Sequence, residues 1–153
     1  MPWKLPSEEI RARVNAAFGT DHYRRMQTVW EAALSQLPGP VPKYTQEQQL
    51  REKLPAELRG AEGPIDPTSA HYLGLARDVG WRGWPLAYKR QVASILEQSG
   101  FAVERTKSGK LFRAHLHYGV PKAAIRANGL MPLIQQVVAG ISAARGLGQI
   151  AER

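Results

Sequence analysis

The sequence predicts a mostly helical α+β protein, with an N-terminal helical hairpin followed by a C-terminal unit of one helix, a β-hairpin and two further helices. Two observations carry this prediction. Apolar residues recur at intervals of three and four along several segments, which is the period of an amphipathic helix. Two β-prone runs, 101–106 and 111–118, flank the tetrapeptide KSGK, which is typical of a β-hairpin. The 153-residue chain is 43% apolar and has no cysteine, so we expect an ordinary core without disulfides.

The N-terminal part begins with two predicted helices. Ser7 is a good N-cap for the first helix, which Gly19 ends. Thr20 or Asp21 can cap a second helix that runs to about Leu37. Its apolar residues have the spacing of one helix face: Met26, Val29, Trp30, Ala33, Leu34 and Leu37. Two such helices cannot bury both apolar stripes alone, so a third element must cover them.

Prolines interrupt the chain after the second helix. Pro38, Pro40 and Pro42 predict an extended connector, because proline cannot continue a helix. Thr45 and Gln48 have the spacing of a capping box and predict a short helix that ends near residue 58.

A domain boundary is predicted next. Residues 60–69, with the sequence GAEGPIDPTS, are rich in glycine and proline and are predicted to be a loop or linker. This boundary separates a helical N-terminal region, 1–59, from a basic α+β region, 70–153.

A short helix is predicted over residues 70–79, followed by the turn WRGWP. Two tryptophans in one tight turn, Trp81 and Trp84, indicate lids over a small core. The alternative is that they stack on nucleic-acid bases beside Arg82.

The next helix and the hairpin follow directly. Pro85 opens a helix that ends at Gly100 and is expected to direct Lys89 and Arg90 outward. A two-residue loop of Ser108 and Gly109 would pair Phe101 with Leu116 and Glu104 with Arg113, leaving one apolar and one polar face.

Two helices are predicted to close the chain. One begins at Pro121 and ends at Asn128, and the last begins at Pro132, is mostly buried, and frays from Gly146. No apolar stretch approaches the roughly 20 residues that a bilayer needs, and the N-terminus lacks the apolar core of a signal peptide. We therefore expect a cytoplasmic protein that does not enter a membrane.

The excess of positive over negative charge is confined to one half of the chain. Residues 1–76 carry nine basic and nine acidic side chains, whereas residues 77–153 carry twelve basic and four acidic ones, which accounts for the net charge of +8. A surface of one sign favours a polyanionic partner. The candidate nucleic-acid-binding residues are Lys89, Arg90, Arg105, Lys107, Lys110, Arg113, His115, Lys122 and Arg126.

The tripeptide His115-Leu116-His117 is the sharpest local motif. On a strand, its two histidines project to one face about 7 Å apart, a spacing that suits one metal ion. The motif resembles the His-hydrophobic-His motif of rolling-circle replication and relaxase nucleases, and the resemblance implies a metal that polarises a phosphate. That family carries a catalytic tyrosine on a later helix, but this chain has no tyrosine after Tyr118. The nearest acid, Glu104, is expected to pair with Arg113, so we predict no metal site.

The helix followed by a basic hairpin also looks like the wing of a winged-helix DNA-binding domain. This resemblance implies that Lys107, Lys110 and Arg113 contact phosphates.

The sequence therefore favours a non-enzymatic protein that binds nucleic acid through phosphates and needs no cofactor. It does not distinguish DNA from RNA. One alternative is a protein-interaction module, an inhibitor or adaptor that binds an acidic partner surface, with the N-terminal helices available for a homodimer. A less favoured alternative is a metal-dependent nuclease that uses His115 and His117.

Overall fold

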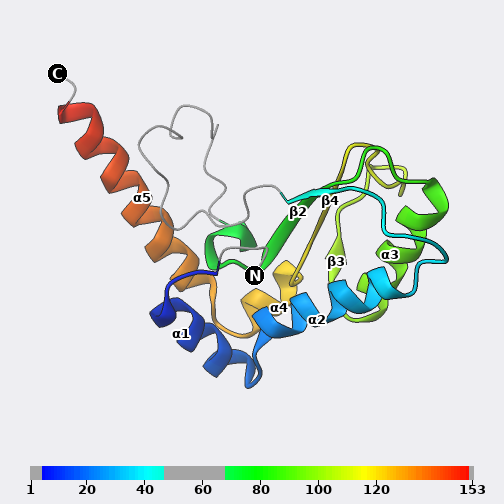
Figure 1. The fold of residues 1–153 in the computed structure, drawn as a ribbon. Helices are drawn as coiled ribbons and strands as arrows, with labels where there is room; N and C mark the ends of the chain where they lie inside the picture. The colour runs from blue at the N-terminus through cyan, green and yellow to red at the C-terminus, as the bar shows by residue number, and fades with distance from the viewer. Residues whose placement is uncertain (1–4, 47–67, 152–153) are drawn as a thin grey trace.

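The computed structural model describes residues 5–46 and 68–151 (Figure 1). In these residues, five α-helices accompany a short 3-10 helix and a four-stranded antiparallel sheet of order β1-β2-β4-β3. The predicted mostly helical α+β class is confirmed. None of the described helices is both long enough and apolar enough to cross a bilayer.

The two N-terminal helices form as their caps predict. α1 spans Glu8–Phe18, and the Ser7 hydroxyl accepts a hydrogen bond from the Ile10 amide. Gly19 ends α1 in the left-handed conformation, with φ of 74°. α2 spans His22–Ser35, and it is the Asp21 carboxylate that accepts from the first free amides of this helix.

β2, Ala76–Gly80, corrects the predicted helix over 70–79. Only Ala70–Leu73 is helical, as the 3-10 turn η2, which Gly74 ends with φ of 70°. β2 lies between β1 and β4 and is largely buried. Its residues therefore lack the alternation of a half-exposed strand, and a short buried run cannot be assigned from periodicity alone.

The register of the predicted hairpin is also corrected. β3, Ala102–Val103, pairs Ala102 with Gly119 and Val103 with Tyr118, and Arg105 bridges to Leu111. β4, His115–Gly119, pairs along its whole length with β2 and only through Tyr118 and Gly119 with β3.

The side chain of Trp81 explains part of this difference. Its indole N–H donates to the Phe112 carbonyl and its amide to the Ala114 carbonyl, which draws residues 112–114 toward β2. Glu104 consequently lies beside His117, to whose carbonyl its amide donates, rather than opposite Arg113.

The remaining helices follow the sequence prediction except at the C-terminus. α3 spans Leu86–Gln98, α4 spans Lys122–Ala127, and α5 spans Met131–Ala151. α5 continues through Gly146 to Ala151, the tail that the sequence predicted to fray. The expectation that α5 is mostly buried is wrong, since only Leu133, Ile134 and Ile141 are buried among its described side chains.

One apolar core joins residues from both sides of the predicted boundary. It includes Val14 of α1, Trp30 of α2, Leu116 of β4 and Ile134 of α5. α2 and α3 pack side by side near the sheet, whereas α5 extends away from it (Figure 1). The core-lid interpretation of Trp81 and Trp84 agrees with their burial at 1% and 4% exposure.

Two predicted features fall on the segment after β1. Thr45–Gln46 forms strand β1 and not the start of a helix. The rest of that predicted helix, and nearly all of the predicted boundary at 60–69, lies outside the described residues.

Candidate functional site

The two faces of β4 have different chemistry. Leu116 and Tyr118 are buried on the face toward α2, where the Tyr118 hydroxyl donates to the Met26 carbonyl. His115 and His117 alternate with them and are only half-buried. The prediction that the two histidines share one face is confirmed, and this face carries the candidate site.

His117 belongs to a cluster with His71 and Asp78, here named the His-Asp-His cluster. Asp78 lies directly opposite His117 in the pairing of β2 with β4. Nδ1 of His117 lies 2.7 Å from Oδ1 of Asp78, and Nε2 of His71 lies 3.4 Å from Oδ2 of the same carboxylate. The two ring nitrogens are 3.3 Å apart. Two imidazole nitrogens and one carboxylate, from three separate segments of the chain, therefore lie close together.

The cluster holds a carboxylate in its ionised form. Burial by itself raises the pKa of Asp78. Hydrogen bonds from His117 and His71, together with the positive charge of these rings when they are protonated, have the larger effect and hold the pKa of Asp78 well below its ordinary range. Asp78 is therefore a negative group at neutral pH. Two imidazoles and one carboxylate form a donor set that can hold a metal ion.

The cluster differs from the histidine pair that the sequence suggested. His115 is not part of it, and its ring stacks on Phe112 with the centroids 5.0 Å apart. His71, which the sequence left isolated, contributes its ring from η2 instead. The cluster could not be predicted because residues 76–80 were not recognised as the strand β2. Recognising this strand would have allowed Asp78 to be placed beside β4.

A pocket of about 430 Å³ adjoins the cluster. His117 lines it together with Glu104 and Lys122. Ser69 and Ala70, which directly precede His71 in the sequence, also line it. The cluster is thus close to the surface, with side-chain exposures of 5% for His71, 20% for Asp78 and 30% for His117.

Two predicted nucleic-acid-binding residues are already engaged within the protein. Lys89 does not face outward as expected. It is buried, and its ammonium group donates to the Arg113 carbonyl at 2.8 Å and lies over the Trp81 ring. Burial, and then the charges of Arg113 and Arg82, lower its pKa. Arg105 is exposed but forms a 2.6 Å ion pair with Glu97.

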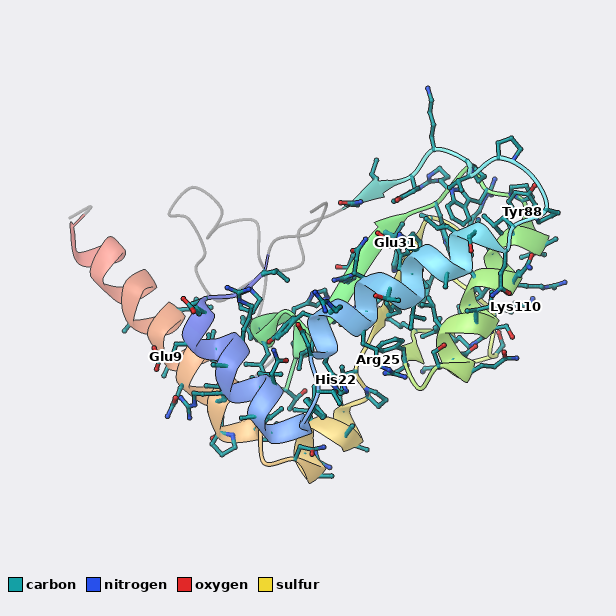
Figure 2. All side chains as sticks on the ribbon, turned by 60° about the horizontal axis from the view of Figure 1, so that its bottom comes forward. Glu9, His22, Arg25, Glu31, Tyr88 and Lys110 are labelled. Atoms are coloured by element: carbon teal, nitrogen blue, oxygen red, sulfur yellow. The ribbon has the colours of Figure 1, made fainter. Side chains whose placement is uncertain are left out.

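The remaining predicted basic residues are exposed and lie in different parts of the fold. Arg90 is on α3, and Lys107, Lys110 and Arg113 lie in the segment that precedes β4. Lys122 and Arg126 lie beyond the other end of β4, on α4, and the Lys122 ammonium donates to Thr68. Figure 2 shows Lys110 close to α3, at the end of the molecule away from α5. The basic residues therefore do not form one continuous stripe.

An open groove, named here the basic groove, lies where the connector before β1 meets β2 and the start of β4. It has a volume of about 1030 Å³, and its polar lining includes Lys43, Arg82, Thr45 and His115. None of the described residues that line it is acidic. Lys43 was not predicted, because in the sequence it stands among prolines far from the other bases.

We expect Lys89→Ala to lower the free energy of unfolding by about 1–3 kcal/mol, since it removes the donor to the Arg113 carbonyl and the ammonium group that lies over the Trp81 ring. Urea unfolding measures this change. Arg90→Ala is the matched control, because the neighbouring side chain is exposed and should contribute within about 0.5 kcal/mol. Equal stability of the two variants would contradict the structural role of Lys89.

Comparisons with protein-family models, with curated proteins and with solved structures find no match to this chain.

Proposed function

We propose that this protein binds the phosphate backbone of nucleic acid along the basic groove. The observation that carries the proposal is the composition of the groove wall, which includes Lys43, Arg82 and His115 and has no acidic residue among its described lining residues. A concave surface with charge of one sign focuses the electrostatic potential and attracts a polyanion. Arg113, which directly precedes the lining residue Ala114, adds a further exposed cation.

The groove also has an apolar part, which indicates a ligand that carries apolar surface in addition to negative charge. Val41, exposed over 43% of its surface, lines the groove with Leu34, Pro42 and Tyr44. Sugars and bases offer apolar surface between successive phosphates, so a mixed wall suits a nucleotide chain. Phosphate contacts carry no sequence information, and we therefore expect weak dependence on base sequence.

The test replaces Lys43, Arg82 and Arg113 together with alanine. We expect the slope of log affinity against log salt concentration to decrease in magnitude by roughly 2–3 on duplex DNA, because each lost phosphate contact removes about 0.9. The three side chains are exposed, so thermal unfolding should stay unchanged. The titration is run with duplex DNA, single-stranded DNA and RNA at several salt concentrations.

A matched variant removes the same charge elsewhere. Arg24, Lys122 and Arg126 are exposed on α2 and α4 and are replaced together with alanine. The groove proposal expects a clearly smaller change in slope for this triple variant. Equal changes would contradict the groove proposal and would indicate either a diffuse effect of net charge or contacts through Lys122 and Arg126, which the sequence also predicted as binding residues. No binding to any nucleic acid at low salt would instead favour the alternative of an acidic protein partner.

The loop of the hairpin is tested by a separate variant. Lys107→Ala with Lys110→Ala removes two exposed charges from the loop between β3 and β4. A further decrease in slope beyond the groove variant would extend the binding surface onto this loop, as the wing resemblance implies.

A further inference from the structure

We infer that His71, Asp78 and His117 form a binding site for one divalent transition-metal ion of the zinc and cobalt class. Each residue offers one donor atom, and the three atoms lie within 4.8 Å of one another. Two imidazole nitrogens and one carboxylate oxygen suit zinc, cobalt and related ions, whereas magnesium and calcium require mainly oxygen ligands. The inference does not rest on the proposed binding of nucleic acid.

The separations between the donor atoms fit an ion of this size. Bonds of about 2.0–2.1 Å at tetrahedral angles place two ligand atoms roughly 3.4 Å apart. The distances from Nε2 of His71 to Nδ1 of His117 and to Oδ2 of Asp78 are 3.3 Å and 3.4 Å. Nδ1 of His117 contacts the other carboxylate oxygen of Asp78, Oδ1, at 2.7 Å. If Oδ1 is the ligand atom, this contact must lengthen by roughly 0.7 Å when the ion binds.

The atoms that form the hydrogen bonds of the cluster are the same atoms that would bind the metal ion. With a proton on Nε2 of His71 and on Nδ1 of His117, both rings donate to the Asp78 carboxylate. In the other tautomer of each ring, the proton moves to Nδ1 of His71 and to Nε2 of His117. The two nitrogens that face Asp78 are then free of protons and can bind one metal ion in their place. The site then holds one carboxylate and two neutral imidazoles, which is the ligand state that a divalent ion requires.

The ligands are positioned by rigid elements of the fold. Asp78 and His117 are direct partners on the two inner strands of the sheet. His71 lies in η2, whose ends are held by the Ser69 hydroxyl and by Gly74. Ligands supported in this way lose little conformational freedom on binding the ion.

The number of protein ligands indicates an open site. Structural zinc sites use four protein ligands, whereas three leave a position for water or an exogenous ligand. The pocket beside His117, which Glu104 and Lys122 also line, provides solvent access to that position. The absence of cysteine in the sequence excludes thiolate as a fourth ligand.

The experiment titrates the full chain, treated with a chelator and dialysed, with Zn²⁺ by calorimetry and with Co²⁺ by visible absorption. We expect one equivalent of either ion to bind and Mg²⁺ not to bind. In the wild-type protein, nitrogen resonances of the His71 and His117 rings should shift with Zn²⁺, and those of His22 and His115 should not. Nucleic-acid binding is measured in EDTA, so failure of either proposal leaves the other testable.

Variants then assign the ligands. His71→Ala, His117→Ala and Asp78→Asn should each weaken Zn²⁺ affinity by at least about 100-fold, since even changes behind the ligands cost 10–100-fold. His115→Ala, two residues along the same face of β4, is the matched control and should leave the affinity unchanged. Absence of one-to-one binding by the wild-type chain overturns the inference. Zn²⁺ binding that is lost in His115→Ala and retained in Asp78→Asn also overturns it. If a variant fails to fold, the Zn²⁺-induced shifts of the histidine resonances in the wild-type protein identify the ligands instead.

Discussion

Replacing Gly119 with alanine is expected to destabilise the protein by about 3 kcal/mol or more, at the upper end of the cost of overpacking. A Cβ at this position would clash with the Leu75 carbonyl oxygen and would lie 2.7 Å from the Ala76 Cα. Both are backbone atoms, so no side-chain rotation relieves the contact. Gly119 is also the partner of Ala76 and of Ala102, and two strand pairs would have to separate.

The change is measured by urea unfolding, against Gly83→Ala as the matched control. A Cβ on Gly83 meets no atom within 4 Å, and its φ is not in the left-handed region. We expect the control to be neutral or slightly stabilising, because alanine restricts the unfolded chain more than glycine does. Equal midpoints for the two variants would show that β2 and β4 can tolerate a side chain between them.

The second large effect is expected for Trp30→Ala, which should lower the free energy of unfolding by about 3–5 kcal/mol. Trp30 is 1% exposed, and its ring stacks on Tyr118 at 5.9 Å and on Trp84 at 6.5 Å between centroids. It also contacts Tyr44 edge-on. One side chain of α2 thus holds together the sheet, the tryptophan turn and the connector.

Circular dichroism measures the loss as a decrease in melting temperature of roughly 10 °C. Thr28→Ala, at an exposed position of the same helix, controls for changes in helix propensity and should shift the midpoint little. Because Tyr44 lines the basic groove, Trp30→Ala should also weaken nucleic-acid binding. A variant that melts like the wild type would contradict the central position of Trp30 in the core.

The two proposed sites are close to each other on β4. His115 lines the basic groove, and His117, roughly 7 Å further along the same face, belongs to the His-Asp-His cluster. Their tests remain independent, because one measures salt dependence in EDTA and the other measures metal affinity without nucleic acid. If both succeed, cleavage of bound DNA or RNA with Zn²⁺ or Mn²⁺ becomes the assay that separates a binding protein from a nuclease. Cleavage lost in His117→Ala would support the nuclease alternative.

Much of the helical structure could be predicted because its signals are local. Ser7 and Asp21 cap α1 and α2, and Gly19 ends α1 where a left-handed residue is needed. These groups act within one turn of the backbone that they stabilise, so neighbouring residues contain the required information. The shared face of His115 and His117 was predictable for the same reason, since side chains alternate along any strand.

Local patterns could not reveal which residues meet across the sheet. A strand buried on both faces has no alternation, so β2 resembled a short helix, and Asp78 had no assigned neighbour. Lys89 was expected to be exposed because charged residues usually are, yet its ammonium group reaches a carbonyl that the hairpin brings over α3.

The sequence by itself determined the α+β class, the helix boundaries near their caps, and the concentration of positive charge in the second half of the chain. Only the tertiary structure decided that His117 meets Asp78, 39 residues away, and His71, 46 residues away, instead of acting with His115. It also placed Lys43 and Arg82 on the wall of the same groove. These contacts depend on the pairing of β2 with β4, and strand pairing is set by long-range packing, for which no residue carries a local signal.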